Sequence, residues 1–430
     1  MSKSRKKRRK SQYKIQPMGY VALALILLII VVGVILIVKG VSGRGGDPVA
    51  EATPEVIATP EITAAPTPAP TPAPTPIPTA RSATIRSLGE IAMQDNLLAS
   101  AESGDGSYDF SEMFSEISDI MGDADFTIAD VEGSLGGTSS ASGSSLLLTP
   151  PSLIQTLKDC GVDMLNLAND HALDGGFSDL MAAIENCQAA GMEYVGAAAS
   201  QEEHNQPKVI DINGIKVGFV AYTESLNDME TKTDAAAVEY GVNLANRSTP
   251  KNDIKALRDA GAEVVIACVS WGDMLKREAT QTQEYMARTL AECGVDVILG
   301  YNPHVIQRAM WLEMTNNGSV TQRTLCILSH GNFLSDSRSQ YSDSGVIFQF
   351  TIQEKQDLSG IEILNPQYIP TYVWRIENGE SAYDYRTLPA GQYLETAPDG
   401  MNYAQESRMR AVWAEAQSIM GSDVAVVAKQ

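Results

Sequence analysis

Residues 161–176 read "GVDMLNLANDHALDGG", an apolar run that leads directly into a group of polar residues. Met164–Leu167 has the length and composition of a buried strand. Four side chains that could contact a ligand follow it: Asn169, Asp170, His171 and Asp174. Because ligands of open α/β sheets bind beyond the carboxyl ends of the strands, this placement predicts a functional edge. Asp174 also precedes a helical pattern, and we expect it to be the N-cap of that helix.

The alternation of apolar runs and helical patterns continues outward from this stretch. Apolar runs predict strands at 83–88, 126–129, 164–167, 209–211, 216–222, 264–269, 295–299 and 325–328. Helical periodicity predicts helices at 108–120, 151–160, 177–190, 252–260 and 282–293. Strands that alternate with helices indicate an α/β fold. Residues 340–375 add strand patterns without helices, which favours a second sheet, and 405–420 reads as a last helix.

Several predicted strands end in residues that can bind ligands. The chain has four histidines, and three of them follow predicted strands: His171, His304 and His330. Glu90 and Glu132 follow the first two strands, and Asn332 lies beside the last of these histidines. Core packing does not account for this clustering, so we expect these residues to converge. His204, the fourth histidine, lies in a polar loop and is expected to be solvated.

The charge distribution indicates a membrane-anchored chain. The net charge is −21, yet residues 1–18 carry eight basic residues and no acidic one. An acidic body would repel a phosphate backbone, so nucleic acid is not an expected partner. Residues 19–38 are twenty residues without a charge, enough to span a bilayer as a transmembrane helix. The positive-inside rule places the N-terminus in the cytoplasm and the rest outside the cell. A cleaved signal peptide is the alternative.

The segment after the predicted anchor reads as a linker. Residues 64–80, "AAPTPAPTPAPTPIPTA", alternate proline with small residues and favour an extended polyproline II conformation. The predicted organisation is a basic cytoplasmic tail (1–18), a transmembrane helix (19–38), a Pro/Thr-rich extracellular linker (39–81), a main domain (82–375) and a C-terminal extension with a helix (376–430). The five cysteines show no metal-type spacing, and we expect buried thiols.

Six segments, in this order, resemble the motifs of the CapA family of capsule-synthesis or poly-γ-glutamate-synthesis accessory proteins. They are "GEIAM" (89–93), "DVEGSL" (130–135), "LANDHALDGG" (167–176), "SWG" (270–272), "GYNPHVIQ" (300–307) and "SHGNF" (329–333). Each motif alone is weak, but each stands at a predicted strand end. The resemblance covers about residues 85–336. It implies a metallophosphatase-like fold with α/β/β/α layers and a site for divalent metal ions.

This chain departs from the family pattern at several ligand positions. Glu90 stands where the family has Asp, and Asp170 replaces the second Asn of an Asn-Asn-His motif. Ser270 replaces a histidine, and Tyr301 and Asn302 replace two more. The resemblance therefore implies these metal ligands: Glu90, Glu132, Asp170, His171 and His304. Possible additional ligands are Asn169, His330 and Asn332.

The remaining ligand set suits one hard divalent ion, with Mn²⁺ or Mg²⁺ favoured. A second ion would be short of ligands, and a metal-free site is the other alternative. If the site is catalytic, its expected catalytic residues are Asp170, His171 and His304.

The resemblance implies a role in the synthesis, export or attachment of an anionic surface polymer, such as a capsule or poly-γ-glutamate. Its expected partners are the membrane, the polymer and the machinery that makes the polymer. Two alternatives remain open: a metal-dependent phosphoesterase at the cell surface, and a non-catalytic scaffold of the cell envelope. An acidic protein that meets an acidic polymer needs a bound cation or a local basic patch between them.

Overall fold

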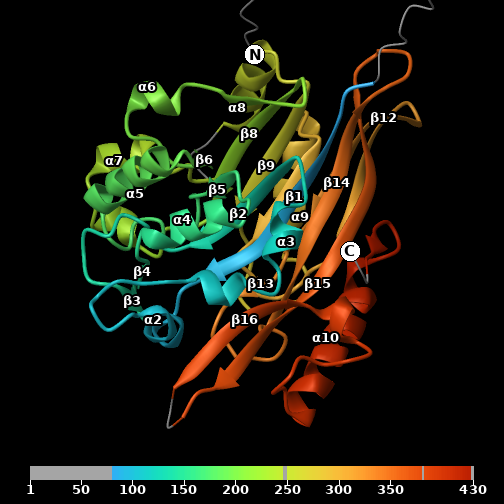
Figure 1. Cartoon of the computed structure of the whole chain (residues 1–430). Coiled ribbons are helices and arrows are strands. Elements are labelled where there is room, and N and C mark those ends of the chain that lie inside the picture. The colour runs from blue at the N-terminus through green and yellow to red at the C-terminus, as the bar shows by residue number, and fades with distance from the viewer. Residues whose placement is uncertain (1–79, 246–248, 380–381, 428–430) are drawn as a thin grey trace, which may run out of the picture. The chain divides into compact units, whose positions relative to one another are not determined.

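The computed structural model describes residues 80–245, 249–379 and 382–427. The predicted basic tail, the transmembrane segment and nearly all of the linker lie outside these residues. Within the described part of the chain, no helix is long and apolar enough to cross a membrane. Figure 1 shows how the described elements are arranged.

The first sheet joins strands from both ends of the described chain in the order β16-β15-β14-β1-β2-β5-β6. Its strands are β1 (Ser82–Ala92), β2 (Phe126–Glu132), β5 (Met164–Asn166), β6 (Glu193–Val195), β14 (Ser344–Glu354), β15 (Ile361–Glu377) and β16 (Tyr383–Pro389). The short strands β13 (Asn332–Leu334) and β17 (Ala425–Val426) pair with β1 and β15. Strands β1, β2, β5 and β6 are parallel, so their carboxyl ends share one edge.

The second sheet has the order β11-β12-β10-β9-β8-β7. Its strands are β7 (Lys208–Ile212), β8 (Ile215–Thr223), β9 (Val264–Ser270), β10 (Val297–Tyr301), β11 (Ala309–Asn316) and β12 (Ser319–Ile327). The four central strands are parallel, and β7 and β11 pair antiparallel at the two edges. A separate two-stranded pair is formed by β3 (Ser142–Gly143) and β4 (Leu147–Leu148).

Helices connect many of these strands. The α-helices are α2 (Asp95–Ala101), α3 (Ser118–Gly122), α4 (Ser152–Asp159), α5 (Phe177–Ala190), α6 (Gln201–His204), α7 (Ala235–Tyr240), α8 (Pro250–Asp259), α9 (Gln281–Cys293) and α10 (Tyr403–Met420). Short 3-10 helices occur at η1 (Ser111–Phe114), η2 (Met229–Thr231) and η3 (Ala390–Tyr393). The predicted C-terminal extension thus supplies β16 and α10, and α10 packs along β15.

The alternation of side chains along the strands separates three large apolar cores. In β9, Ile266 points into the core between the two sheets, whereas its neighbour Ala267 packs with α8 and α9. In β2, Ile128 points into the same inter-sheet core, whereas Ala129 packs with α4 and α5. Helices therefore cover the outer face of each sheet. This arrangement confirms the expected α/β/β/α layers.

The structure corrects two predictions about secondary structure. Residues 108–120 do not form one helix, because a 3-10 turn at η1 and the short α3 divide the segment. Local side-chain bonds compete with the helix there, since Asp109 accepts from the backbone of Ser111. Strands β14 and β15 do not start a second sheet either. They extend the first one, because β14 pairs directly with β1.

The loop after β12 lies against the end of β1, and the two backbones approach closely there. The nitrogen of Glu90 donates to the carbonyl of Gly331 at 2.9 Å. A side chain at Gly89 would place its Cβ 2.4 Å from that same carbonyl oxygen, so only glycine fits this position. The loop after β12 is thereby held against the end of β1.

Candidate metal centre

Five of the predicted ligands come together as two groups of three that share one carboxylate. Glu90, Glu132 and His304 form the first group, and Glu132, Asp170 and His171 form the second. Within each group the nearest ligand atoms lie within 4.8 Å of one another. These residues come from the ends of β1 and β2 and from the loops after β5 and β10. Both sheets therefore contribute to the cluster.

The first group is buried and its separations suit metal ligands. Nδ1 of His304 lies 3.4 Å from Oε2 of Glu90, and its Nε2 lies 3.5 Å from Oε1 of Glu132. These distances are long for charge-assisted hydrogen bonds, which are about 2.7–2.9 Å. The separation of Nε2 from Oε1 of Glu132 is close to the spacing of two ligands that each lie about 2.1 Å from one ion, which is roughly 3.0–3.4 Å. Nδ1 bonds to Asn332 instead, so Nε2 is the nitrogen that could bind an ion.

The loop that carries His304 has a constrained backbone. Asn302 and His304 have φ angles of 90° and 57°, in the left-handed region that non-glycine residues seldom adopt. The side chain of Asn302 donates to the carbonyls of Trp271 and Gly272, at 3.2 and 2.7 Å. The backbone nitrogen of His304 donates to Oε1 of Glu90 at 3.3 Å. Strain of this kind concentrates at functional sites.

The second group has a carboxylate that orients its histidine. Nδ1 of His171 donates to Oδ2 of Asp174 at 2.6 Å, which leaves Nε2 facing Oε1 of Glu132 at 3.7 Å. Metal-bound histidines commonly have such an outer carboxylate. Asp170 accepts a 3.2 Å hydrogen bond from Asn227, in the loop after β8. Both histidines of the cluster thus present Nε2 to the same oxygen of Glu132.

Burial makes the carboxylates of the cluster hard to ionise. Burial raises the pKa of Glu90 to about 7, although the charge of His304 opposes the shift. Burial also raises the pKa of Glu132. Asp130, which accepts a hydrogen bond from Asn166 at 2.5 Å, is fully buried nearby and its pKa is raised well above its ordinary value. A cation placed among these groups would relieve their mutual repulsion.

The same carboxylates hold both histidines in the protonated form. Burial lowers the pKa of His304, but the charges of Glu132 and Glu90 outweigh it and raise the pKa to about 9. Burial likewise lowers the pKa of His171, but the hydrogen bond to Asp174 and the charge of Glu132 raise it to about 9.

The donor set fits a divalent ion. It offers carboxylate oxygens and imidazole nitrogens, without a cysteine, and this chemistry suits hard ions such as Mn²⁺ or Mg²⁺. Each group supplies three candidate ligands, so a second position is better supplied than the sequence suggested. The roles of the five residues as ligands stay a prediction.

The three possible additional ligands have structural roles. The side-chain oxygen of Asn332 lies 3.0 Å from Nδ1 of His304, so Asn332 orients this histidine. Asn169 bonds to the backbone of Val131 and His171 and is itself buried. His330 belongs to neither group: its Nδ1 donates to the carbonyl of Gly300 at 2.9 Å. It therefore does not replace a lost histidine.

Two substituted family positions are occupied by internal contacts. Tyr301 is buried, and its ring stacks on His330. Its hydroxyl forms a 2.6 Å hydrogen bond with the hydroxyl of Ser87. Asn302 braces the loop of Trp271, as described above. These side chains replace possible ligands with packing and hydrogen bonds.

Asp174 and Asn227 contribute to the site in ways that the sequence did not predict. Asp174 was expected to be an N-cap, but Gly176 occupies that position and no side chain caps the helix there. Asp174 instead accepts from His171 and from the nitrogen of Leu147. The spacing of three residues between His171 and Asp174 was the available signal. Asn227 lies far along the chain and gave none.

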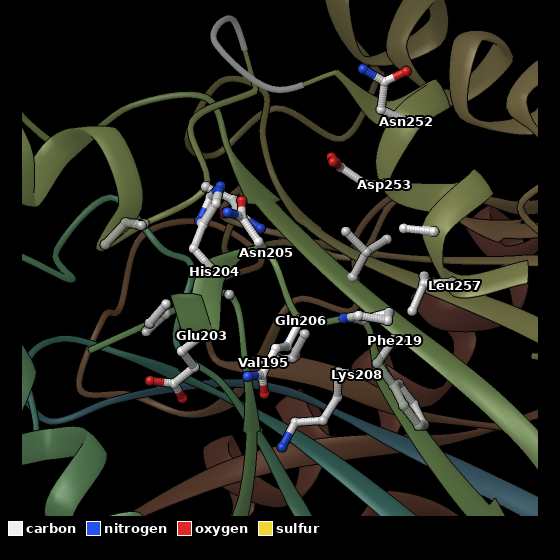
Figure 2. A pocket seen from close by; sticks show the side chains of 18 of the residues that line it. Val195, Glu203, His204, Asn205, Gln206, Lys208, Phe219, Asn252, Asp253 and Leu257 are labelled. Atoms are coloured by element: carbon white, nitrogen blue, oxygen red, sulfur yellow. The ribbon is translucent and has the colours of Figure 1, made fainter. Parts of the chain in front are cut away.

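A separate cavity of about 470 Å³ lies between β6, α6, β8 and α8 and contains none of the cluster residues. Figure 2 shows the side chains of His204 and Asn205 close together, across from Asn252 and Asp253 of α8. His204 was expected to be solvated, but it is half-buried and its Nδ1 lies 3.0 Å from the carbonyl of Tyr240. His204 ends helix α6, and its ring contacts the last residue of α7, which accounts for the difference.

Comparison with solved structures gives matches with low TM-scores, and two of them are described here. A novel phosphatase from Mycoplasma pneumoniae is 13% identical, with a TM-score of 0.38, and the match covers 68% of this chain and 94% of that one. The calcineurin-like phosphoesterase YfkN from Bacillus subtilis is 12% identical, with a TM-score of 0.36, over 66% of this chain and 91% of that one.

Sequence relatives are capsule proteins. The capsule biosynthesis protein CapA of Bacillus anthracis is 23% identical over 203 residues, which are 47% of this chain and 47% of that protein. The PGA biosynthesis protein CapA of Bacillus subtilis strain 168 is 23% identical over 265 residues, 55% of this chain and 66% of that protein. The chain thus spans about half to two thirds of the length of these relatives. Residues 84–337, more than half of the chain, match the family of the bacterial capsule synthesis protein PGA_cap, and the chain belongs to this family.

Proposed function

We propose that this protein serves the synthesis, export or attachment of an anionic capsule polymer of the poly-γ-glutamate class, and that it does so with a divalent-metal centre built around Glu132. Membership of the capsule-synthesis family supports the part of the proposal that concerns a capsule polymer. The single observation that carries the metal centre is the pair of ligand groups that share Glu132.

Each residue of the cluster has a definite part in this proposal. Glu90, Glu132 and His304 would hold one ion, and Glu132, Asp170 and His171 a second. A divalent ion bound there supplies Lewis-acid and water-activating chemistry. Asp174 and Asn332, through the contacts described above, keep the Nε2 atoms of the two histidines turned toward Glu132.

The location of the protein is part of the proposal. Residues 19–38 would anchor it in the cell membrane with the basic tail in the cytoplasm. The Pro/Thr-rich linker, at about 3.1 Å per residue, would hold the main domain away from the membrane on the extracellular side. The polymer would meet the domain there.

Replacement of the chromosomal copy by a Glu132→Gln variant tests the proposal. Cells with this variant should lose most of the cell-associated polymer, measured by glutamate released on acid hydrolysis. Cells with Glu203→Gln, a half-buried glutamate outside the cluster that bonds to Ala199, should keep it. Equal polymer in both, with equal protein levels, would contradict a role for the cluster.

A metal-dependent phosphoesterase is the second candidate. The observation that favours it is the shared carboxylate, because two-ion hydrolases use ions about 3.5–4 Å apart that clamp one phosphate. Hydrolysis of bis(p-nitrophenyl) phosphate by the Mn²⁺-loaded protein, lost in Glu132→Gln, would support it. Normal polymer together with neither metal binding nor hydrolysis would leave the scaffold function.

A further inference from the structure

A second cleft, of about 710 Å³, lies beside the loop that carries His304. Lys276, Arg277, Thr280 and Tyr341 line it. The nitrogen of Leu275, also in its wall, donates to the carbonyl of Pro303 at 2.8 Å, directly before His304.

Further hydrogen bonds connect both segments that line the cleft, 273–280 and 340–341, to the candidate metal centre. Gln307 donates to the carbonyl of Lys276 at 2.9 Å. Next to Tyr341, the carbonyl of Ser342 accepts a hydrogen bond from the side chain of Asn332, the residue that orients His304. The cleft is thus built from the same loops as the candidate metal centre.

Arg277 is an unusual arginine. Seven of the arginines that the structure describes are buried or half-buried, and Arg277 is one of them. Each of the other six forms an ion pair with a carboxylate: Arg81, Arg86, Arg258, Arg375, Arg386 and Arg408. Arg277 forms none, its Nε is buried without a hydrogen-bond partner, and its Nη2 has one long bond, 3.5 Å, to the carbonyl of Glu415. A partly buried cation without an anion is costly.

The surroundings of Arg277 hold its guanidinium in place for a ligand. Its Cζ lies 4.0 Å from the centre of the Tyr341 ring, which positions the planar group. Leu275 and Tyr341, which both line the cleft, have φ angles of 61° and 73°. Such strain in bulky residues is found at ligand clamps. Thr280 caps the start of α9, so the positive end of that helix adds to the field.

We propose that this cleft binds a carboxylate of the acidic polymer, with Arg277 as the bidentate partner and Lys276 as the second charge. The inference rests on the proposed function and names the part of the protein that recognises the substrate. Asp273 and Glu278 also line the cleft, but both are exposed, so water screens their repulsion. Lys276 is exposed as well, so the attraction for an acidic chain rests mainly on Arg277, which is half-buried and forms no ion pair.

Binding of short γ-linked glutamate oligomers to the metal-free full chain, measured by calorimetry at low salt, tests the inference. Arg277→Gln should weaken binding by about 10- to 100-fold, as expected for a lost charge-assisted pair. Lys276→Ala, at an exposed position that should not disturb folding, should weaken it by a smaller factor. Arg288→Gln, an exposed arginine of α9 outside the cleft, should bind like the wild type.

Equal binding by the wild type and Arg277→Gln, or no binding at all, would overturn the inference. Binding of pyrophosphate instead of the oligomer, lost in Arg277→Gln, would overturn the assignment of a carboxylate. Since the protein is metal-free, neither result bears on metal binding at Glu132. Conversely, oligomer binding through Arg277 in a protein whose Glu132→Gln variant keeps normal polymer would refute the proposed role of the metal centre and leave this inference standing.

Discussion

His304 and His330 are both buried at the same edge of the fold, yet their surroundings give them opposite character. His304 lies between Glu90 and Glu132, and their charges raise its pKa to about 9 in spite of burial. His330 meets no carboxylate, and burial lowers its pKa to about 4, opposed only by the carbonyl of Gly300. One imidazole thus faces two carboxylates, and the other packs against aromatic rings with no carboxylate beside it.

The difference shows that the carboxylates define the site. Three histidines follow strand ends, but only the two that face Glu132 join the cluster. His330 stacks on Tyr301 with ring centres 4.8 Å apart and meets Phe348 edge-on. Its Nε2 has no hydrogen-bond partner. A count of histidines therefore overstates the number of ligands.

Glu132→Gln should have the largest effect, because it removes the carboxylate that sets the surroundings of His304 apart from those of His330. It removes the charge that both cluster histidines face, so Mn²⁺ affinity should fall by more than about 100-fold, since loss of even an outer partner costs about 10–100-fold. Titration calorimetry of the full chain would measure it. Glu203→Gln is the control, and unchanged affinity in Glu132→Gln would show that the metal binds elsewhere.

Asp174→Asn should weaken the same site less. The variant keeps a hydrogen-bond acceptor for His171 but loses the charge, and Mn²⁺ affinity should fall by about 10–100-fold. Competition with a metal-sensitive dye would measure the change. Asp253→Asn, whose carboxylate accepts from Tyr222, is the matched control outside the cluster. A loss as large as that of Glu132→Gln would mean that Asp174 is itself a ligand.

Acid should reveal the neutral character of His330. The folded protein holds it uncharged down to about pH 4, whereas the unfolded chain takes up a proton near pH 6.5. Neutral His330 therefore contributes to the free energy of unfolding above pH 6.5, and this contribution is lost as the pH falls toward 4. The loss should reach about 2 kcal/mol at pH 5. Urea unfolding of the wild type and His330→Phe at pH 7 and 5 would measure it. The variant should lose less stability on acidification; identical losses would contradict the assignment.

Alkaline conditions should favour metal binding. Because the pKa values of His171 and His304 are raised to about 9, both carry a proton at neutral pH that a metal ion must displace. Mn²⁺ affinity should rise roughly tenfold per pH unit for each proton displaced, between about pH 6.5 and 8.5. Calorimetry in buffers with different ionisation enthalpies would count the protons. A pH-independent affinity would mean that neither imidazole is a ligand.

Tyr301→Phe should have the smallest effect. It removes the hydroxyl next to Ser87 and keeps the ring that stacks on His330, so the free energy of unfolding should fall by about 1 kcal/mol. Metal affinity should stay unchanged, because Tyr301 occupies a family ligand position without facing Glu132. A change in affinity, measured as for Glu132→Gln, would return this position to the site.

The alternation of apolar runs and helical patterns predicted the α/β fold, and the family resemblance implied its layers. It failed where long-range pairing decides. The pattern of β14 cannot show that it adds to the sheet of β1, since an antiparallel neighbour and a new sheet need the same residues. The helix predicted over 108–120 failed because local bonds from Asp109 and other short polar residues compete with helical ones.

The residues of the candidate cluster could be predicted from the sequence, but most of the residues that orient them could not. Strand ends brought Glu90, Glu132 and His304 together, as the family pattern implied. The part of Asp174 was hidden, because a carboxylate three residues after a histidine also reads as a helix cap. Arg277 was hidden too, since nothing in its local sequence tells that it lacks an anion. Such properties arise from packing between distant segments.

The most direct test of the metal centre is anomalous diffraction from crystals of the protein grown with Mn²⁺. The account predicts a peak within coordination distance of Oε1 of Glu132 and Nε2 of His304. A second peak next to His171 would identify a two-ion centre. A map with Mn²⁺ bound only elsewhere, or with none at Glu132, would contradict the central claim that this shared carboxylate organises a metal site.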